Sequence, residues 1–360
     1  MKRTISLIII LSLCFAFASC VNDPEDTLMS TDSNDSSVIS SQPSQSQVSE
    51  VSETVSQESA VESEISDTDS DISEENSETS EVSDATSDTT LARKSTVYVS
   101  LGDSIPRGYG LTDPQNQSFP SILAESFKGF SETVKFENAA VDGNTSSDLL
   151  QLLKSENSPS LLKDADIITV TIGANNLLKP FSAAMQKVFE NSLSDIDFSN
   201  MDSSKFFAVF PQIADDVNSA LNSDDFNSEM KKGLDTLKSE LPLIFSRLKT
   251  ISPNAKIYIT TVYNPYKGLN IRIPNTTSAV MLENIANVYI LQLNDIIKES
   301  ASKAEIEVVD IYTAFEESTE QLVNAIVSII PPVFSFDPHP NQAGHLKIAE
   351  TYLKALSEFK

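Results

Sequence analysis

The chain contains almost no cysteine. Its two cysteines, Cys14 and Cys20, both lie within the first 20 of 360 residues. The rest of the chain therefore cannot form a disulfide, use a cysteine nucleophile or bind a metal through cysteine. Any folded domain in it must draw its stability from a hydrophobic core.

Basic residues are also scarce. The 25 Lys and Arg stand against 52 Asp and Glu, which gives a formal net charge of -27. Because binding to phosphate backbones requires clustered basic side chains, this balance argues against a nucleic-acid partner. The acidity is uneven, since 19 of the acidic residues fall within residues 21–92, where there is no Lys or Arg.

The N-terminal apolar segment is too short to span a bilayer comfortably. It covers residues 7–17, follows two basic residues and leads through two small residues to Cys20. This pattern predicts a signal peptide over residues 1–20 and export from the cell. The end of the segment also resembles the lipobox of bacterial lipoproteins, with Phe17 where Leu is usual, which implies lipidation of Cys20 and attachment to the extracellular face of the cell membrane. An ordinary secretory signal that contains a cysteine by chance is the alternative.

Residues 21–94 are rich in Ser, Asp and Glu. From 21 to 92 they include 20 Ser and no aromatic residue. Such a segment cannot bury enough apolar surface to offset the entropy lost on ordering. We interpret it as a disordered, self-repelling linker that holds a domain away from the membrane. A specific acidic binding tract is the alternative.

A globular domain is predicted over residues 95–360. Short apolar runs alternate there with longer segments of helical period. The sequence predicts strands over 97–101, 134–139, 167–172, 257–262 and 306–311, and helices over 118–130, from 147 to 153 and beyond, over 280–300 and over 341–356. Strand–helix alternation is typical of a three-layer α/β domain with a parallel sheet. The active site of such a domain lies beyond the C-terminal ends of the strands.

Polar residues follow two of these strands, and a histidine precedes the last helix. Ser104 comes after the first strand and Asn175 after the third. One of only two histidines, His339, lies in a Pro-flanked loop with Asp337 two residues earlier. A serine nucleophile needs a base that takes its proton and returns it, which suits His339. The other histidine, His345, falls on the apolar face of the last helix and is predicted to be a packed residue.

Four motifs, in this order, resemble the blocks of the SGNH hydrolases, also called GDSL lipases and esterases. One motif alone is weak evidence because short motifs occur by chance. The four are Gly102-Asp103-Ser104-Ile105, the segment from Asn138 to Thr145 that contains Gly143, Gly173-Ala174-Asn175-Asn176, and Asp337-Pro338-His339-Pro340-Asn341. The resemblance covers residues 95–360. It implies a three-layer α/β/α sandwich with a five-stranded parallel sheet of flavodoxin-like type.

The resemblance also implies a role for each site residue. Ser104 is the nucleophile, His339 the general base and then acid, and Asp337 the residue that orients His339. The backbone N–H groups of Ser104 and Gly143 and the side-chain amide of Asn175 form the oxyanion hole. The implied reaction is hydrolysis of a carboxylic ester through an acyl-enzyme intermediate, without metal or cofactor. We expect a monomer that acts on a small-molecule, lipid or acylated-glycan ester.

Two positions depart from the family pattern. The acidic residue usually lies three positions before the histidine, where this chain has Phe336. Asp337 must therefore reach the imidazole from two positions before, or a backbone carbonyl takes its role. Asn176 stands where Asp is usual, at a position that is structural in the family. A non-catalytic ligand-binding lipoprotein on the same fold and a merely structural surface protein are the alternatives to an esterase.

Two segments near the predicted site each allow two interpretations. Residues 177–250 are helical in pattern, and they either form a cap over the pocket or only pack helices onto the sheet. Residues 323–334 either line part of an acyl pocket or form a buried helix followed by a Pro-terminated turn.

Overall fold

The computed structural model describes residues 95–193, 203–272, 279–329 and 332–357. The predicted signal peptide over 1–20, its Cys20 and the predicted linker over 21–94 lie outside the described residues. Within the described part, no helix is both long enough and apolar enough to cross a membrane.

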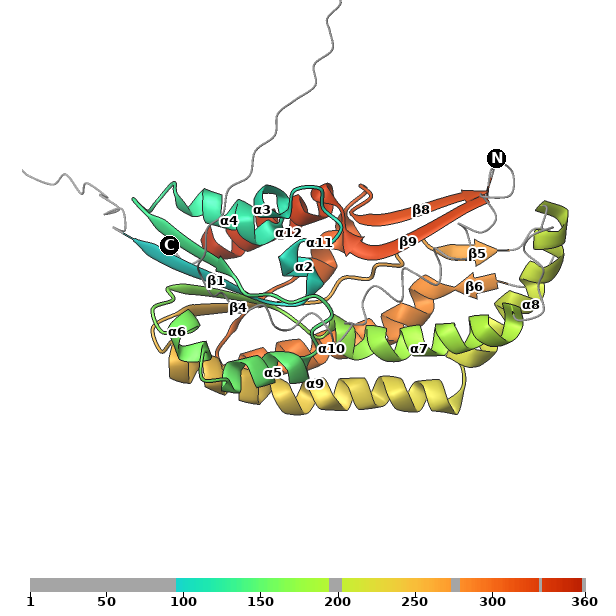
Figure 1. Ribbon diagram of the computed structural model, residues 1–360, viewed down its shortest axis with the longest axis horizontal. Coiled ribbons are helices and arrows are strands. Elements are labelled where there is room, and N and C mark those ends of the chain that lie inside the picture. Colours follow the sequence, from blue (N-terminus) through green and yellow to red (C-terminus); the bar gives the residue numbers. More distant parts are fainter. Residues whose placement is uncertain (1–94, 194–202, 273–278, 330–331, 358–360) are drawn as a thin grey trace, which may run out of the picture. The chain divides into compact units, whose positions relative to one another are not determined.

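A five-stranded parallel sheet forms the centre of the domain (Figure 1). Its order is β2-β1-β3-β4-β7, which is the order of the flavodoxin-like fold that the family resemblance implies. Every strand begins and ends within two residues of its predicted range. They are β1 (Thr96–Gly102), β2 (Val134–Asn138), β3 (Ile167–Thr171), β4 (Lys256–Thr260) and β7 (Glu307–Val309).

Helices cover both faces of this sheet, which gives the predicted three layers (Figure 1). Side chains alternate along each strand, so that Val99 and Leu101 of β1 face one core and Tyr98 faces the other. The first core is closed by α5 (Ser146–Lys154), α6 (Ser158–Leu162), α7 (Ala174–Leu193), α8 (Ser203–Leu221), α9 (Asp224–Ile251) and α10 (Leu282–Lys303). The second is closed by α4 (Phe119–Phe127), α11 (Ile311–Glu317) and α12 (Gln342–Ser357). Two short helices, α2 (Ser104–Arg107) and α3 (Pro114–Gln117), follow β1.

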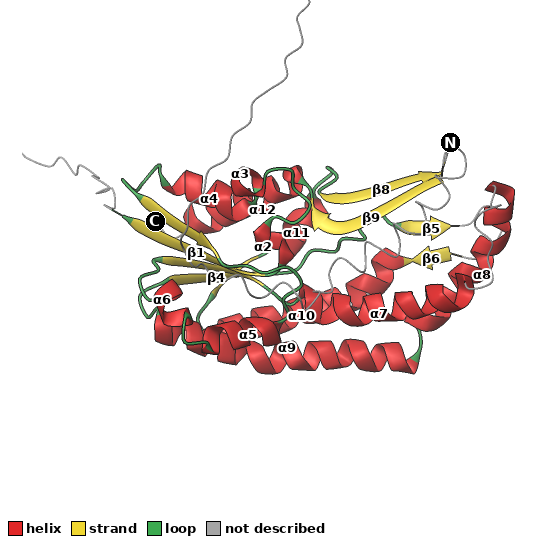
Figure 2. Ribbon diagram, viewed as in Figure 1, coloured by secondary structure: helices red, strands yellow, loops and turns green. Residues whose placement is uncertain are grey.

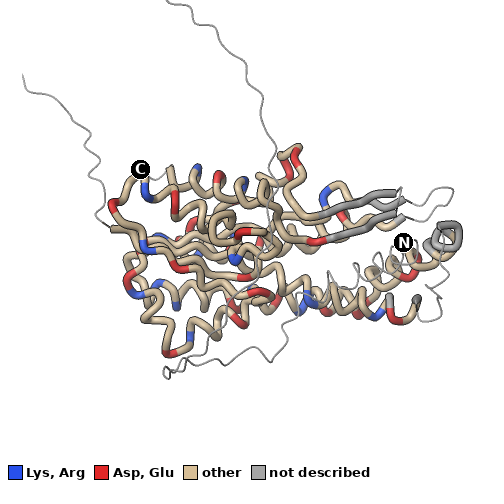
Figure 3. Tube along the Cα trace, turned by 45° about the horizontal axis from the view of Figure 1, so that its top comes forward, with Lys and Arg blue, Asp and Glu red and all other residues tan. Residues whose placement is uncertain are grey.

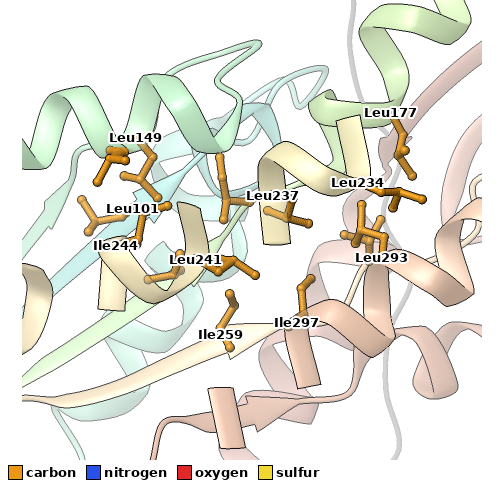
Figure 4. Packing of buried hydrophobic residues seen from close by; sticks show 14 of the residues in the cluster. Leu101, Leu149, Leu177, Leu234, Leu237, Leu241, Ile244, Ile259, Leu293 and Ile297 are labelled. Carbon is orange, nitrogen blue, oxygen red and sulfur yellow. The ribbon is translucent and has the colours of Figure 1, made fainter. Parts of the chain in front are cut away.

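Helix α9 spans the first core and continues to the predicted site. Its buried residues recur every three or four positions, as a helix with one apolar face requires. The Ser223 side chain caps its N-terminus by accepting a hydrogen bond from the Phe226 N–H at 3.1 Å. Figure 4 shows Leu237, Leu241 and Ile244 of this helix among core residues of the sheet and of α10.

Two predicted helical segments are strands instead (Figure 2). Residues 280 and 281, predicted as the start of a long helix over 280–300, belong to β6 (Ala279–Met281), which pairs with β5 (Asn270–Arg272) before α10 begins. The predicted buried helix within 323–334 is wrong as well, because β8 (Val323–Ile329) pairs antiparallel with β9 (Pro332–Pro340). The β-branched residues in both stretches suit a pleated strand once a partner is available. The other interpretation of 323–334, an acyl-pocket lining, concerns side chains that for the most part lie outside the described residues.

Charged side chains are mixed along the described trace. Figure 3 shows Lys and Arg scattered among Asp and Glu. Several of them pair over one helical turn, such as Lys231 with Asp235 and Lys303 with Glu299. Such exposed pairs each contribute little to stability, so the fold rests on its two apolar cores.

Candidate active site

Ser104 lies at the C-terminal end of β1, where the chain turns sharply into α2. The turn requires glycine at position 102, because φ is +142° and a Cβ there would lie 2.1 Å from the Thr171 carbonyl oxygen. Asp103 is the N-cap of α2, and Ser104 is its first residue. The backbone of this turn therefore places Ser104 at the C-terminal edge of the sheet, where the residue is 5% exposed.

His339 lies next to Ser104 although 235 positions separate them in the sequence. The His339 Nε2 atom is 2.8 Å from the Ser104 Oγ atom. On the other side of the ring, Nδ1 is 2.5 Å from Asp337 Oδ1. A carboxylate at Nδ1 makes that nitrogen the donor and leaves Nε2 to accept the serine proton. The structure thus joins Ser104, His339 and Asp337 in one hydrogen-bonded chain.

Asp337 contacts the imidazole although it lies only two residues before His339. Its Oδ1 atom also accepts a hydrogen bond from the backbone N–H of His339 at 3.0 Å. The loop after α2 lies close to the other carboxylate oxygen of Asp337, since a Cβ at Gly110 would lie 3.2 Å from Oδ2. A carboxylate two residues before the histidine can therefore hold the ring, and no backbone carbonyl is needed for that role.

Two tyrosines that the sequence motifs do not include support the histidine. The Tyr263 hydroxyl donates to the Pro338 carbonyl at 2.6 Å, and its ring stacks on Phe315 with centroids 4.4 Å apart. The Tyr109 ring lies 4.4 Å from the His339 ring. Tyr263 follows the end of β4, so the rule that sites gather at C-terminal strand ends could have pointed to it. No sequence signal marks Tyr109.

The loop that carries Gly143 is fastened beside the end of β1. The Val141 N–H donates to the Gly102 carbonyl at 3.1 Å, and the Asn144 side chain donates to the same oxygen at 3.4 Å. Gly143 has a φ of +74°, a conformation that glycine adopts without strain. Its backbone is thus held close to the turn that presents Ser104.

Asn175 lies at the start of α7 and lines the same pocket as Ser104 and His339. Its side-chain amide donates to the Asn144 carbonyl at 3.0 Å and is 2% exposed. An amide has two N–H groups, so this bond fixes its orientation and leaves the second donor for another acceptor. The bond thus ties Asn175 to the loop that carries Gly143, and this loop is in turn bonded to Gly102 beside Ser104.

Asn176 has a structural place, as predicted for its position. Its Oδ1 atom accepts from the Ser146 N–H at 3.0 Å, and its Nδ2 atom donates to the Ser146 hydroxyl at 2.8 Å. Both bonds join α7 to the N-terminus of α5. Helix α9 also passes close to this point, because a Cβ at Gly233 would lie 2.1 Å from the Asn176 carbonyl oxygen.

His345 is a packed residue, as predicted. It is fully buried in α12, and its Nδ1 atom accepts a hydrogen bond from the Phe119 N–H at 3.2 Å. Burial lowers the pKa of the imidazole to about 3, so this histidine is neutral at physiological pH.

Asp103 is a buried carboxyl group next to the nucleophile. Its Oδ1 atom accepts from the Ile105 N–H at 3.0 Å, whereas Oδ2 has no hydrogen-bond partner among the described residues. Burial raises the pKa of this carboxyl to about 7. The charged groups around it are His339, which lowers the pKa, and Asp142, which raises it.

We expect Asp103→Asn to stabilise the protein at neutral pH but not in acid. Between its unfolded pKa near 4 and its folded pKa of about 7, Asp103 loses its proton in the unfolded state first, so the free energy of unfolding falls as pH rises through this window. Asn keeps the cap and cannot ionise. The variant should gain on the order of a few kcal/mol above pH 7. Thermal melts from pH 4 to pH 8 test this, and a gain in Tm that is the same at both ends contradicts it.

An apolar pocket opens beside Ser104. Helices α7, α9 and α10 and the loop after β4 supply its walls. Within the segment 177–250, α9 packs onto the sheet, and α7 and α9 line the pocket. The cap over the pocket stays a prediction. Among the described residues, no three His, Cys, Asp or Glu side chains are grouped so that they could hold a metal ion.

Comparison with known proteins gives a family and several similar folds. Residues 100–347 match the model of the GDSL-like Lipase/Acylhydrolase family. The uncharacterized protein YpmR of Bacillus subtilis (strain 168) is 34% identical over 124 residues, which cover 30% of this chain and 48% of YpmR. The match thus spans about half the length of that relative.

Two of the similar solved structures are a lipase and a phospholipase. The lipase Lip_vut3 from a goat rumen metagenome is 18% identical, with a TM-score of 0.46, over 72% of this chain and 97% of that one. Phospholipase A1 from Streptomyces albidoflavus NA297 is 19% identical, with a TM-score of 0.47, over 73% of this chain and 98% of that one. These values describe a likeness in fold and assign no substrate.

Proposed function

The chain belongs to the GDSL-like lipase/acylhydrolase family, a family of hydrolases, and from this premise we propose that it hydrolyses carboxylic esters with Ser104 as nucleophile. The observation that carries the proposal is the position of His339 between two partners, 2.8 Å from Ser104 Oγ and 2.5 Å from Asp337 Oδ1. This arrangement supplies a nucleophile, a base and a group that orients the base.

In the first half of the proposed reaction, Ser104 Oγ attacks the carbonyl carbon of the ester and its proton passes to His339 Nε2. The carbonyl oxygen gains negative charge, which the N–H groups of Ser104 and Gly143 and the Asn175 amide stabilise. The C–O bond to the alcohol then breaks, and His339 returns the proton to the leaving oxygen. The products are a free alcohol and an acyl group on Ser104.

In the second half, water attacks the acyl-enzyme. His339 Nε2 takes a proton from the water, and the same three donors hold the oxyanion. When the bond to Ser104 Oγ breaks, His339 gives the proton back to the serine. Asp337 keeps its hydrogen bond to Nδ1 throughout, so that the imidazolium is paired with a carboxylate at each step.

The proposal is tested by turnover of esters by the full chain. We expect the full chain to hydrolyse p-nitrophenyl esters with saturation kinetics and Ser104→Ala to be inactive with an unchanged Tm. A folded protein that binds esters without hydrolysing any of them, in both forms, would instead favour a ligand-binding lipoprotein on the same fold.

Asn175→Ala is expected to lower kcat by ~10²–10³, because it removes one donor to the oxyanion. Its neighbour provides a matched control, since Asn176→Ala removes only bonds between helices. That variant should lose about 1–3 kcal/mol of stability and change kcat little. Measuring kcat and Tm for both variants distinguishes a role of Asn175 in catalysis from a role in the fold. Equal losses of kcat in both would show that Asn175 acts only through the fold.

A further inference from the structure

We propose that the apolar pocket beside Ser104 binds the acyl part of the substrate and selects uncharged aliphatic acyl chains longer than butyryl. The inference rests on the proposed ester hydrolysis and names the substrate class for it. We call this space the acyl pocket. Its cavity volume is about 90 Å³, within about 770 Å³ of empty space that includes open solvent at its mouth.

The walls of the acyl pocket are almost entirely apolar. The catalytic end carries Ser104, Asn175, His339 and the buried carboxyl of Asp103. Away from that end, the described lining contains no Lys, Arg, Asp or Glu. Most of its aliphatic and small side chains come from three helices, with Leu177 and Leu178 from α7, Met230 from α9, and Ile285, Ala286 and Ile290 from α10.

A linked set of aromatic rings stiffens these walls. Phe181 of α7 meets Phe226 of α9 with ring centroids 6.3 Å apart, and it meets Tyr266 at 5.7 Å. Phe226 in turn meets Tyr289 of α10 edge-on at 5.7 Å. The Tyr289 hydroxyl donates to the side chain of Asn227, so the polar atom of this ring is hydrogen-bonded. Contacts between the rings thus hold all three helices around the pocket.

This lining discriminates between the ester classes left open by the sequence. A sugar hydroxyl or a charged group placed against these walls would lose water and find few partners, at a cost of about 1–3 kcal/mol or more. Each methylene placed there is removed from water favourably. An acetyl group reaches Ser104 but leaves most of the apolar wall uncovered. The acyl chain that gains most is therefore a longer aliphatic one.

The first test compares p-nitrophenyl acetate, butyrate, hexanoate and octanoate with the full chain, each below its micellar concentration. We expect kcat/KM to rise about fourfold for each added methylene, the fold-change that a buried CH₂ produces. A series that is highest for acetate overturns the acyl pocket while leaving the ester hydrolase in place. Inactivity on all four esters overturns the proposed function itself.

The second test fills the pocket from α10 with a matched control on the same helix. Ala286 is partly buried and lines the pocket, whereas Val288 is 56% exposed on the other side of the helix. Ala286→Phe should lower the ratio of kcat/KM for octanoate to that for acetate at least tenfold, and Val288→Phe should leave the ratio unchanged. Leu178→Phe repeats the test from α7 if Ala286→Phe has a lowered Tm. An unchanged ratio in both folded pocket variants overturns the proposal.

A binding measurement separates the acyl pocket from catalysis. Decanoate should raise the Tm of Ser104→Ala and raise it less in Ser104→Ala combined with Ala286→Phe. This result in a chain that hydrolyses no ester would support the pocket and reject the proposed reaction. Equal shifts in both proteins would reject the pocket.

Discussion

His339→Ala is expected to lower kcat for a p-nitrophenyl ester by about 10⁶, the loss seen when either the serine or the histidine of such a triad is removed. The reason lies in the contact between His339 Nε2 and Ser104 Oγ at 2.8 Å, through which the proposed reaction passes the serine proton to its base. Without it the hydroxyl stays protonated and is a poor nucleophile.

The second histidine provides the control for this prediction. His345 is buried in α12 and bonds to the backbone of Phe119, outside the proton path. His345→Gln should lower Tm and leave kcat within a few-fold of the parent protein. If His339→Ala keeps more than about 1% of kcat, the assignment of the base fails, since loss of this group removes far more in a working triad.

Asp337→Asn is expected to lower kcat by ~10⁴ with little change in Tm. An amide at this position can present its N–H to the ring, which favours the tautomer with the proton on Nε2, and this tautomer cannot accept from Ser104. The pairing with the imidazolium is lost as well. Steady-state kinetics at several pH values measures the effect.

Asp166 provides a control for this variant. The Asp166 carboxylate accepts from the Val97 N–H at the other end of the sheet, so Asp166→Asn should affect only stability. A loss of less than tenfold in Asp337→Asn would mean that another group, such as a backbone carbonyl, orients His339. The spacing two residues before the histidine would then be incompatible with a functional triad acid.

The central sheet and the polar residues at its edge could be predicted well from the sequence. The run of Ile, Thr and Val in β3 is rich in β-branched residues and buried throughout, which fits a strand covered on both faces. Parallel strands bring their C-terminal ends to one edge, so the positions of Ser104 and Asn175 after two such strands are enough to predict that they lie together.

The remaining features depend on contacts that have no local signature. The stretches in β6 and β8 contain short apolar runs that suit either a strand or a buried helix, and only the pairing with β5 and β9 decides between them. The bond from Tyr263 to the Pro338 carbonyl joins residues 75 positions apart. The use of α7, α9 and α10 as pocket walls likewise follows from how these helices pack, which helical periodicity alone does not specify.

The most direct test of an activated Ser104 is covalent labelling of the full chain with a fluorophosphonate, read by mass spectrometry beside Ser104→Ala. An activated serine attacks the phosphorus and displaces fluoride, so we predict one label on Ser104, none in Ser104→Ala and strongly reduced labelling in His339→Ala. A folded chain that takes up no label, or takes it up elsewhere, would contradict the proposed catalytic serine.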